Sequence, residues 1–285
     1  MVTRRSSFVG PFLYGFAWAV VAPAVLLLWA VATENVVTLP AIHSPLAGGA
    51  LALAGAALMA LGMGALKVYG HGLPMNAYPP PDYVARGIYG WVSHPIYVGF
   101  IVLAAGAAAA FGSASGLWLV TPAAALALLA LVLGYEAPDL ARRFGPAVQP
   151  PRLSLPRTGD GAPGVWERVS VYLLVLLPWL LAYQAVQFFG VPADAALSYF
   201  PFEAEWPVIE WTEAIYASTY LLVLVTPLVV RSRPALRRFA VTGLIASAAV
   251  TLIYFAVPLV APPRPLEPTT VLGRLAALER SMSGA

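Results

Sequence analysis

The chain contains no cysteine and carries little charge. Among its 285 residues, 10% are charged and 60% are hydrophobic, and the mean hydropathy is +0.79. A soluble domain carries charge on about a quarter of its residues, so an ordinary soluble enzyme is excluded. Without cysteine, disulfides, thiolate metal sites and cysteine nucleophiles are excluded as well. The composition indicates a polytopic membrane protein.

Long apolar runs fill most of the chain, and proline, glycine or charged residues bound each of them. A membrane helix needs roughly 20 apolar residues. Runs of this kind lie near 11–32, 45–66, 95–112, 114–135, 168–190, 209–230 and 239–261. We therefore expect an all-α fold, a polytopic membrane helical bundle of about seven transmembrane helices. The first run lacks a small-residue cleavage site, so we expect it to be retained as an anchor.

The basic residues predict the orientation, because cytoplasmic loops carry an excess of arginine and lysine. With the N-terminus in the cytoplasm and the C-terminus outside, 13 of the 16 basic residues lie on the cytoplasmic side. Those outside are Arg264, Arg274 and Arg280, and those inside are Arg4, Arg5, Lys67, Arg86, Arg142, Arg143, Arg152, Arg157, Arg168, Arg231, Arg233, Arg237 and Arg238. We expect the inside loops to meet anionic lipid headgroups, and no basic patch interleaved with aromatic residues indicates a nucleic-acid partner.

A change of composition divides the chain in two. Residues 137–167 are rich in proline, glycine, arginine and aspartate, as surface connections are. We expect a four-span domain at 1–157, a linker at 158–167 and a three-span domain at 168–285. The terminal stretch 269–281 has Val271, Leu272, Leu275 and Leu278 on one face, which predicts an interfacial amphipathic helix. Its alternative is a linker helix towards further spans.

Polar, aromatic and turn-forming residues gather between 70 and 99, beside an otherwise apolar sequence. The runs on either side of the short Gly112–Gly116 connection must form an antiparallel hairpin. At 1.5 Å per residue, each arm extends about 27 Å, so His94 and Glu136 are expected at the same membrane face. An acid at the end of a membrane helix is a functional candidate by default. The alternatives are a headgroup-level Glu136 paired with arginine and a merely interfacial His94.

The motif order in this region resembles the isoprenylcysteine carboxyl methyltransferase and phospholipid N-methyltransferase group of integral membrane methyltransferases. The resemblance covers about 45–157, where Leu155-Pro-Arg157 is similar to the closing Val-Pro-Arg of that family. The matching residues are Gly70, Gly72, Pro74, Pro79, Pro80, Val84, Gly87, Tyr89, His94, Pro95, Tyr97, Gly99, Glu136, Pro138, Leu140, Phe144 and Gly145.

This resemblance implies an S-adenosylmethionine pocket that opens to the cytoplasm and a lipid or lipidated acceptor that arrives sideways between helices. The implied cofactor-binding residues are His94, Tyr97, Gly99, Glu136, Tyr89 and Gly87. An acid suits the cationic cofactor, and aromatic faces suit its sulfonium. Methyl transfer depends mainly on alignment, so no catalytic nucleophile is assigned, and no metal is expected.

Four positions depart from the family pattern. Ser93 stands where the family has arginine, Ala137 replaces the second acid of a Glu-Glu pair, and Val148 and Pro151 replace two tyrosines. Without a cation at Ser93, an isoprenylcysteine carboxylate loses its partner. The alternative function is therefore a non-catalytic membrane module that binds lipid or a partner through a degenerate methyltransferase pocket.

The second half is similar in its aromatic and proline texture to the front portion of inositol-phosphorylceramide-synthase-like members of the type 2 phosphatidic acid phosphatase superfamily. The similar segments are 198–202, 210–220, Arg237-Arg238 and 258–265. Neither histidine of that superfamily is present, so we expect these spans to serve packing and lipid contact, or the chain to be the N-terminal fragment of a fusion.

Two histidines besides His94 occur in the chain, His43 and His71. His71 lies in a loop between glycines and is either solvated or part of the cofactor site, whereas His43 is expected outside and away from the chemistry. The alanine- and arginine-rich, lysine-poor composition indicates a prokaryotic cytoplasmic (inner) membrane protein. The oligomeric state stays open.

Overall fold

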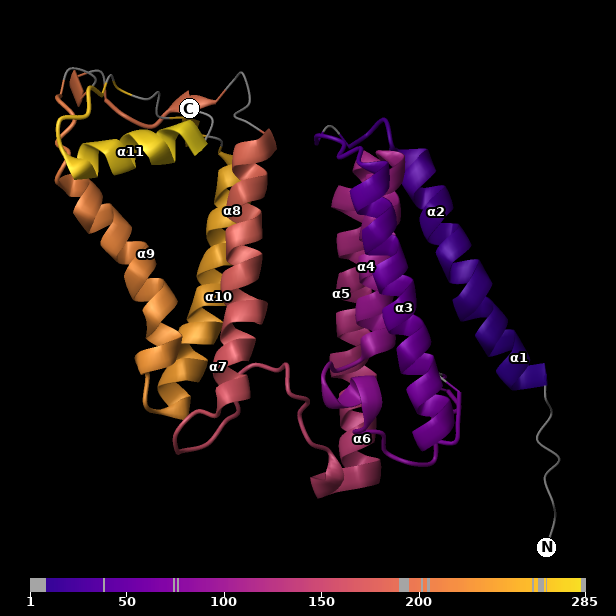
Figure 1. Ribbon diagram of the computed structural model, residues 1–285. Coiled ribbons are helices and arrows are strands. Elements are labelled where there is room, and N and C mark those ends of the chain that lie inside the picture. The colour runs from indigo at the N-terminus through magenta and orange to yellow at the C-terminus, as the bar shows by residue number, and fades with distance from the viewer. Residues whose placement is uncertain are drawn as a thin grey trace, which may run out of the picture. The chain divides into compact units, whose positions relative to one another are not determined.

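The computed structural model divides the chain into two compact units, Met1–Arg152 and Leu153–Ala285 (Figure 1). It describes residues 9–37, 39–73, 75, 77–189, 195–200, 202–203, 206–257, 259–260, 264 and 266–282. Of the residues named above, Arg4, Arg5 and Pro74 lie outside this description, as do residue 201 of the segment 198–202 and residues 258, 261–263 and 265 of the segment 258–265.

Unit 1 is built from helices. A first long helix combines α1 (Val9–Phe16), the π-helical η1 (Ala17–Val21) and α2 (Ala22–Thr33). The elements that follow are α3 (Pro45–Tyr69), η2 (Gly87–Gly90), α4 (Pro95–Phe111), η3 (Gly116–Val120), α5 (Thr121–Leu131), η4 (Val132–Glu136), α6 (Ala137–Phe144) and η5 (Gly145–Ala147).

Unit 2 is also helical, with one short pair of parallel strands. Its elements are α7 (Val165–Val171), η6 (Tyr172–Leu176), α8 (Leu177–Phe189), β1 (Ala196–Leu197), α9 (Thr212–Val229), α10 (Arg233–Ala256), β2 (Leu259–Val260) and α11 (Val271–Met282). Its core is the cluster of Val171, Val175, Leu236 and Ala240, between α7, η6 and α10.

The predicted fold class is confirmed, because within the described residues six helices are long and apolar enough to cross a membrane. They are Val9–Thr33, Pro45–Tyr69, Gly116–Ala147, Val165–Gln184, Thr212–Val229 and Arg233–Tyr254. The remaining predicted span, near 95–112, forms the shorter apolar helix Pro95–Phe111. The protein is therefore an all-α polytopic membrane protein. Its orientation in the membrane stays a prediction.

Glycines bring α3 and α4 into backbone contact along their lengths (Figure 1). A Cβ on Gly55 would lie 2.5 Å from the carbonyl oxygen of Gly99, and a Cβ on Gly99 would lie 2.6 Å from that of Gly55. Gly48 and Gly106 face each other in the same way, at 2.7 and 2.8 Å. Because lipid tails are as apolar as the side chains, such close packing is a main source of helix association in membranes.

Gly62 of α3 fixes the start of α4. A Cβ on Gly62 would lie 2.8 Å from Cγ1 of Ile96 and 3.1 Å from Cγ of Pro95. Pro95 is the first residue of α4 and is buried. The packing of α3 therefore positions the residue before Pro95, which is His94.

Each π-helical turn ends two residues before a proline. The four turns end at Val21, Val120, Glu136 and Leu176, and the prolines are Pro23, Pro122, Pro138 and Pro178. Proline lacks an N–H and its ring collides with the carbonyl group one turn earlier. A wider turn before the ring relieves that collision, and such π-bulges occur often at functional sites.

The end of α2 is fastened to the connection between α4 and α5. The Glu34 carboxylate accepts hydrogen bonds from Oγ of Ser113 at 2.6 Å and from the backbone N–H of Ala114 at 2.8 Å. The hydroxyls of Thr33 and Ser115 share another at 2.6 Å. The hydrogen bond from Ser113 lowers the pKa of Glu34. The hairpin loop is thus held at the membrane face opposite the His94 end of α4.

In unit 2, helix α11 lies across the end where α9 begins (Figure 1). The Glu210 carboxylate accepts hydrogen bonds from the N–H and hydroxyl groups of Thr269 and Thr270, just before the first turn of α11. These hydrogen bonds, chiefly from the Thr270 hydroxyl and the Thr269 N–H, lower the pKa of Glu210 to about 2. Gly273 lies against this carboxylate, where any side chain would collide.

We expect Gly55→Ala to destabilise the protein by about 1–3 kcal/mol, because the new methyl group meets the backbone of α4 and forces the helices apart. The matched control is Gly64→Ala, on the same helix, where no atom lies within 4 Å of the new Cβ. Thermal unfolding in detergent measures both variants. Equal midpoints for the two would contradict the glycine contact.

We expect low pH to release α11 from Glu210. A carboxyl group whose pKa is lowered on folding stabilises the fold above its ordinary pKa of 4.5, and that contribution is lost as the pH falls towards about 2. The mobility of α11 can be measured with a nitroxide spin label on Ala277→Cys, because the natural chain has no other cysteine. Mobility should rise over that pH range, and Glu210→Gln should show raised mobility at neutral pH. The control is Glu267→Gln, at an exposed acid, which should leave the mobility of α11 unchanged. If α11 stays immobile in Glu210→Gln, the hydrogen bonds to Glu210 do not hold the helix in place.

Candidate functional site

His94 and Glu136 lie in contact at one end of the α4–α5 hairpin. Nδ1 of His94 lies 3.0 Å from Oε1 of Glu136, and each side chain is 23% exposed. His94 immediately precedes α4, whereas Glu136 ends the π turn that follows α5. The hairpin therefore joins two residues 42 positions apart in the sequence, as the lengths of its arms predict.

The backbone of His94 is in a left-handed conformation, with φ 51° and ψ 51°. This conformation is uncommon outside glycine, and His71 is the other residue besides glycine that adopts it among those described. Such strain persists only where the surroundings enforce it, and it occurs often at binding sites. Here Pro95 follows and the hydrogen bond to Glu136 holds the ring.

Glu136 presents one satisfied and one unsatisfied oxygen. Oε1 bonds to His94, but Oε2 is buried and has no hydrogen-bond partner among the described residues. A buried carboxylate oxygen without a partner costs about 1–3 kcal/mol or more, so native structures rarely keep one without a reason. The arrangement suits a ligand that brings a cation or a hydrogen-bond donor to Oε2.

Two tyrosines complete the group around this acid. The ring of Tyr97, one turn into α4, stacks on the ring of His94 with centroids 5.8 Å apart and planes 4° from parallel. Tyr89, in η2, is largely buried. Its pKa is raised mainly by this burial and further by the negative charge of Glu136. The phenol of Tyr89 therefore stays neutral and can donate a hydrogen bond beside Glu136.

The two predicted glycines occupy different settings. Gly99 is buried against Gly55 and Met59 of α3, where its missing side chain permits helix contact. Gly87 has φ +59° and starts the 3-10 turn that carries Tyr89. The structure thus gives Gly99 a packing role and Gly87 a turn role. Their cofactor contacts stay predictions.

The segment after α6 folds back on the loop that carries Tyr89. The hydroxyl of Tyr83 donates to the carbonyl of Gln149 at 3.1 Å. The N–H of Arg152 donates to the carbonyl of Gly90 at 3.1 Å, and its guanidinium lies 4.4 Å from the centre of the Trp91 ring. These contacts hold the loop beside the site. The sequence patterns did not predict these contacts, although Trp91 stands only three residues before His94.

Other expected positions lie apart from the His94–Glu136 contact. Nδ1 of His71 lies 2.9 Å from Oδ2 of Asp82, and both side chains are well exposed. His43 lies at the opposite end of α4, against Gly112. Ser93 and Ala137, two of the four departures from the family pattern, are exposed.

The polar residues of this site all come from one stretch of unit 1, between the end of α3 and the end of η4. Residues 44–147 match the model of the phospholipid methyltransferase family. The match confirms the resemblance predicted from the motifs, and it supports a membrane methyltransferase acting on lipid. It ends before Val148, Pro151 and the Leu155-Pro-Arg157 segment. No curated protein and no solved structure matches the chain.

We expect the side chains of His94 and Glu136 to be energetically coupled. In a double-mutant cycle of His94→Ala and Glu136→Ala, the coupling energy should be about 0.5–3 kcal/mol, because each single change already removes the same hydrogen bond. Unfolding of the wild type, both single variants and the double variant measures it. Additive effects would show that the two groups do not interact.

Proposed function

We propose that the protein transfers a methyl group from S-adenosylmethionine to a lipid or lipidated acceptor at the cytoplasmic face of a prokaryotic inner membrane. The observation that carries this proposal is the buried, unpartnered Oε2 of Glu136 beside His94 and two tyrosines. The match to the phospholipid methyltransferase family supports it independently.

The residues present fit the cofactor. S-adenosylmethionine carries an ammonium and a sulfonium, and Oε2 of Glu136 offers a negative acceptor to a cation. The stacked rings of His94 and Tyr97 offer aromatic faces, which attract cations. Tyr89 supplies a neutral hydroxyl donor. His94, Tyr97, Tyr89 and Glu136 are therefore the residues we expect to hold it.

The chain contributes alignment more than chemistry. When bound, S-adenosylmethionine supplies a methyl group already activated on its sulfonium. His94 fixes Oε1 of Glu136, so that Oε2 keeps one direction. Correct placement of two reactants can account for about 7–11 kcal/mol of a barrier. No side-chain nucleophile is needed, which agrees with a chain that has no cysteine.

The cytoplasmic location rests on the basic residues. Lys67, Arg86, Arg142, Arg143 and Arg152 flank the same end of the unit 1 helices as the site. By the positive-inside rule this end faces the cytoplasm, where a soluble methyl donor is available. The acceptor would approach from the bilayer, because the neighbouring helices present apolar side chains outward.

A non-catalytic function is the second candidate, and the exposed Ser93 and Ala137 favour it. Neither residue supplies the charge that the family pattern has at its position. A pocket that keeps Glu136 but lacks these charges could bind the cofactor, or a lipid, without transferring a methyl group.

Calorimetric titration of the purified protein with S-adenosylmethionine tests cofactor binding. We expect the wild type to bind and Glu136→Gln to bind about 10- to 100-fold more weakly, the effect of losing a charged hydrogen-bond acceptor. Asp82→Asn is the matched control, since it removes the exposed acid that pairs with His71. Its affinity should equal that of the wild type.

Transfer of a radiolabelled methyl group into extracted lipid separates the two candidates. Binding together with transfer supports the enzyme, whereas binding without transfer to any lipid fraction supports the non-catalytic module. If the wild type does not bind the cofactor, or if Glu136→Gln binds as well as the wild type, the proposed site is wrong.

A further inference from the structure

One end of unit 2 carries far more positive than negative charge. The segments 153–168 and 230–238, which meet there, contain six arginines and two acids. The acids are Asp160 and Glu167, and the arginines are Arg157, Arg168, Arg231, Arg233, Arg237 and Arg238. How these charges pair decides which of them can bind a partner.

Both carboxylate oxygens of Glu167 are already bonded within unit 2. Its carboxylate lies 3.0 Å from Nε of Arg233 and accepts hydrogen bonds from the N–H groups of Arg157 at 2.9 Å and Gly164 at 2.8 Å. Arg233 also donates to the carbonyls of Asp160 and Ala162. This pair therefore folds the segment before α7 onto the start of α10.

Two further arginines donate hydrogen bonds to backbone carbonyl groups. Arg168 donates to the carbonyls of Pro227 and Leu228, at the end of α9, where carbonyl groups lack helical partners. Arg237 donates from one nitrogen to the carbonyl of Pro156 at 2.7 Å. That single bond leaves most of the Arg237 guanidinium available, next to the residue that precedes Arg157.

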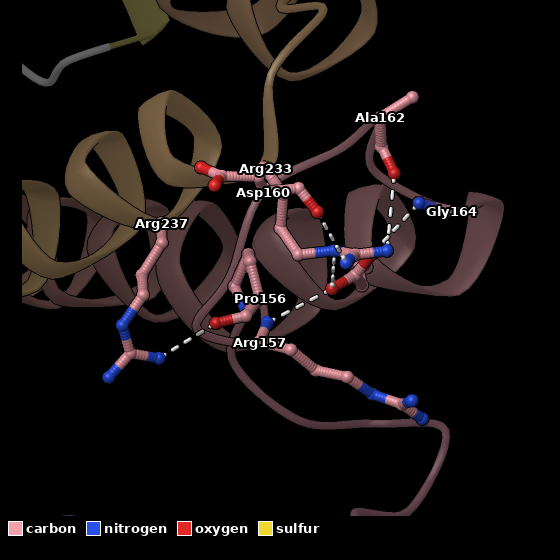
Figure 2. Close-up of polar contacts among 8 residues, drawn as sticks. Pro156, Arg157, Asp160, Ala162, Gly164, Arg233 and Arg237 are labelled. Carbon is pink, nitrogen blue, oxygen red and sulfur yellow. Dashed lines mark hydrogen bonds and ion pairs between the residues drawn. The ribbon is translucent and has the colours of Figure 1, made fainter.

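The side chains of the other three arginines make no hydrogen bond or ion pair within the described residues. Arg157, Arg231 and Arg238 are exposed, and no residue in the described part of the chain bonds to their guanidinium groups. Figure 2 shows the side chain of Arg157 extending away from Arg233 and Gly164, the contact residues of Glu167. Asp160 is the only acid here outside the Glu167–Arg233 pair. The surplus positive charge therefore has no compensation within this end of the unit.

The depth of these arginines indicates their partner. Apolar helices end or begin beside them, at Val165 of α7, Val229 of α9 and Arg233 of α10. Trp166, 43% exposed, stands at the same level, as aromatic residues do at membrane interfaces. Guanidinium groups at this level meet phosphate groups of lipids, which they bind with planar, paired hydrogen bonds.

We propose that this arginine cluster, defined by Arg157, Arg231, Arg237 and Arg238, binds the phosphate headgroups of anionic phospholipids. The cluster attaches unit 2 to the acidic leaflet of the membrane. It does so independently of any methyl transfer in unit 1.

Native mass spectrometry of the full chain in detergent, with equal amounts of phosphatidylglycerol and phosphatidylcholine, tests the cluster. The wild type should retain phosphatidylglycerol preferentially. The variant Arg157→Gln, Arg231→Gln, Arg238→Gln should lose that preference by about 10-fold or more, since each arginine near the surface contributes to anionic-lipid binding. Raising the salt concentration should weaken the wild-type preference.

The matched control removes the same number of charges outside the cluster. It is the variant Arg86→Gln, Arg142→Gln, Arg274→Gln, which changes three exposed arginines. Arg86 and Arg142 are also expected on the cytoplasmic side but lie outside the cluster, so the control should keep most of the wild-type preference. Circular dichroism and gel filtration should show both triple variants folded. The three mutated guanidinium groups of the cluster make no internal contact within the described residues, and the control breaks one exposed ion pair, Arg142 with Asp139 at 3.5 Å. Equal preference in the cluster variant and the wild type overturns the proposal, and so does an equal loss in the control.

Discussion

Backbone contact between α3 and α4 is the constraint on which unit 1 depends. Gly55 meets Gly99 and Gly48 meets Gly106, so two apolar helices approach as closely as their main chains allow. In lipid there is no water to expel from between helices, and this fit replaces the hydrophobic effect. Gly62 extends the contact to Pro95 and so carries it to the edge of the site.

The site follows from that contact and from the hairpin. Once α3 fixes the start of α4, the strained His94 has a defined position, and the return of α5 brings Glu136 to it. Glu34 holds the opposite end of the same hairpin. A polar pair between two membrane helices is therefore supported from both faces, and little freedom is left to the buried carboxylate.

Sequence patterns predicted the helical class, most span positions and the meeting of His94 with Glu136, because helix length and a short loop determine all three. They did not predict the packing role of Gly99, since that depends on which helix lies opposite. The contacts of Trp91 with Arg152 and of Glu210 with Thr270 were likewise missed. Both join segments far apart in the chain through loops that have no periodic signal.

The π turn before Pro138 holds one residue more than an α-helical turn would. Each residue advances a helix by about 100° around its axis. The direction of Glu136 is therefore set by a phase shift within the helix, which the wider turn before Pro138 introduces. Two chains with the same motif, one with the wide turn and one without it, would aim the same acid at different sides of the helix.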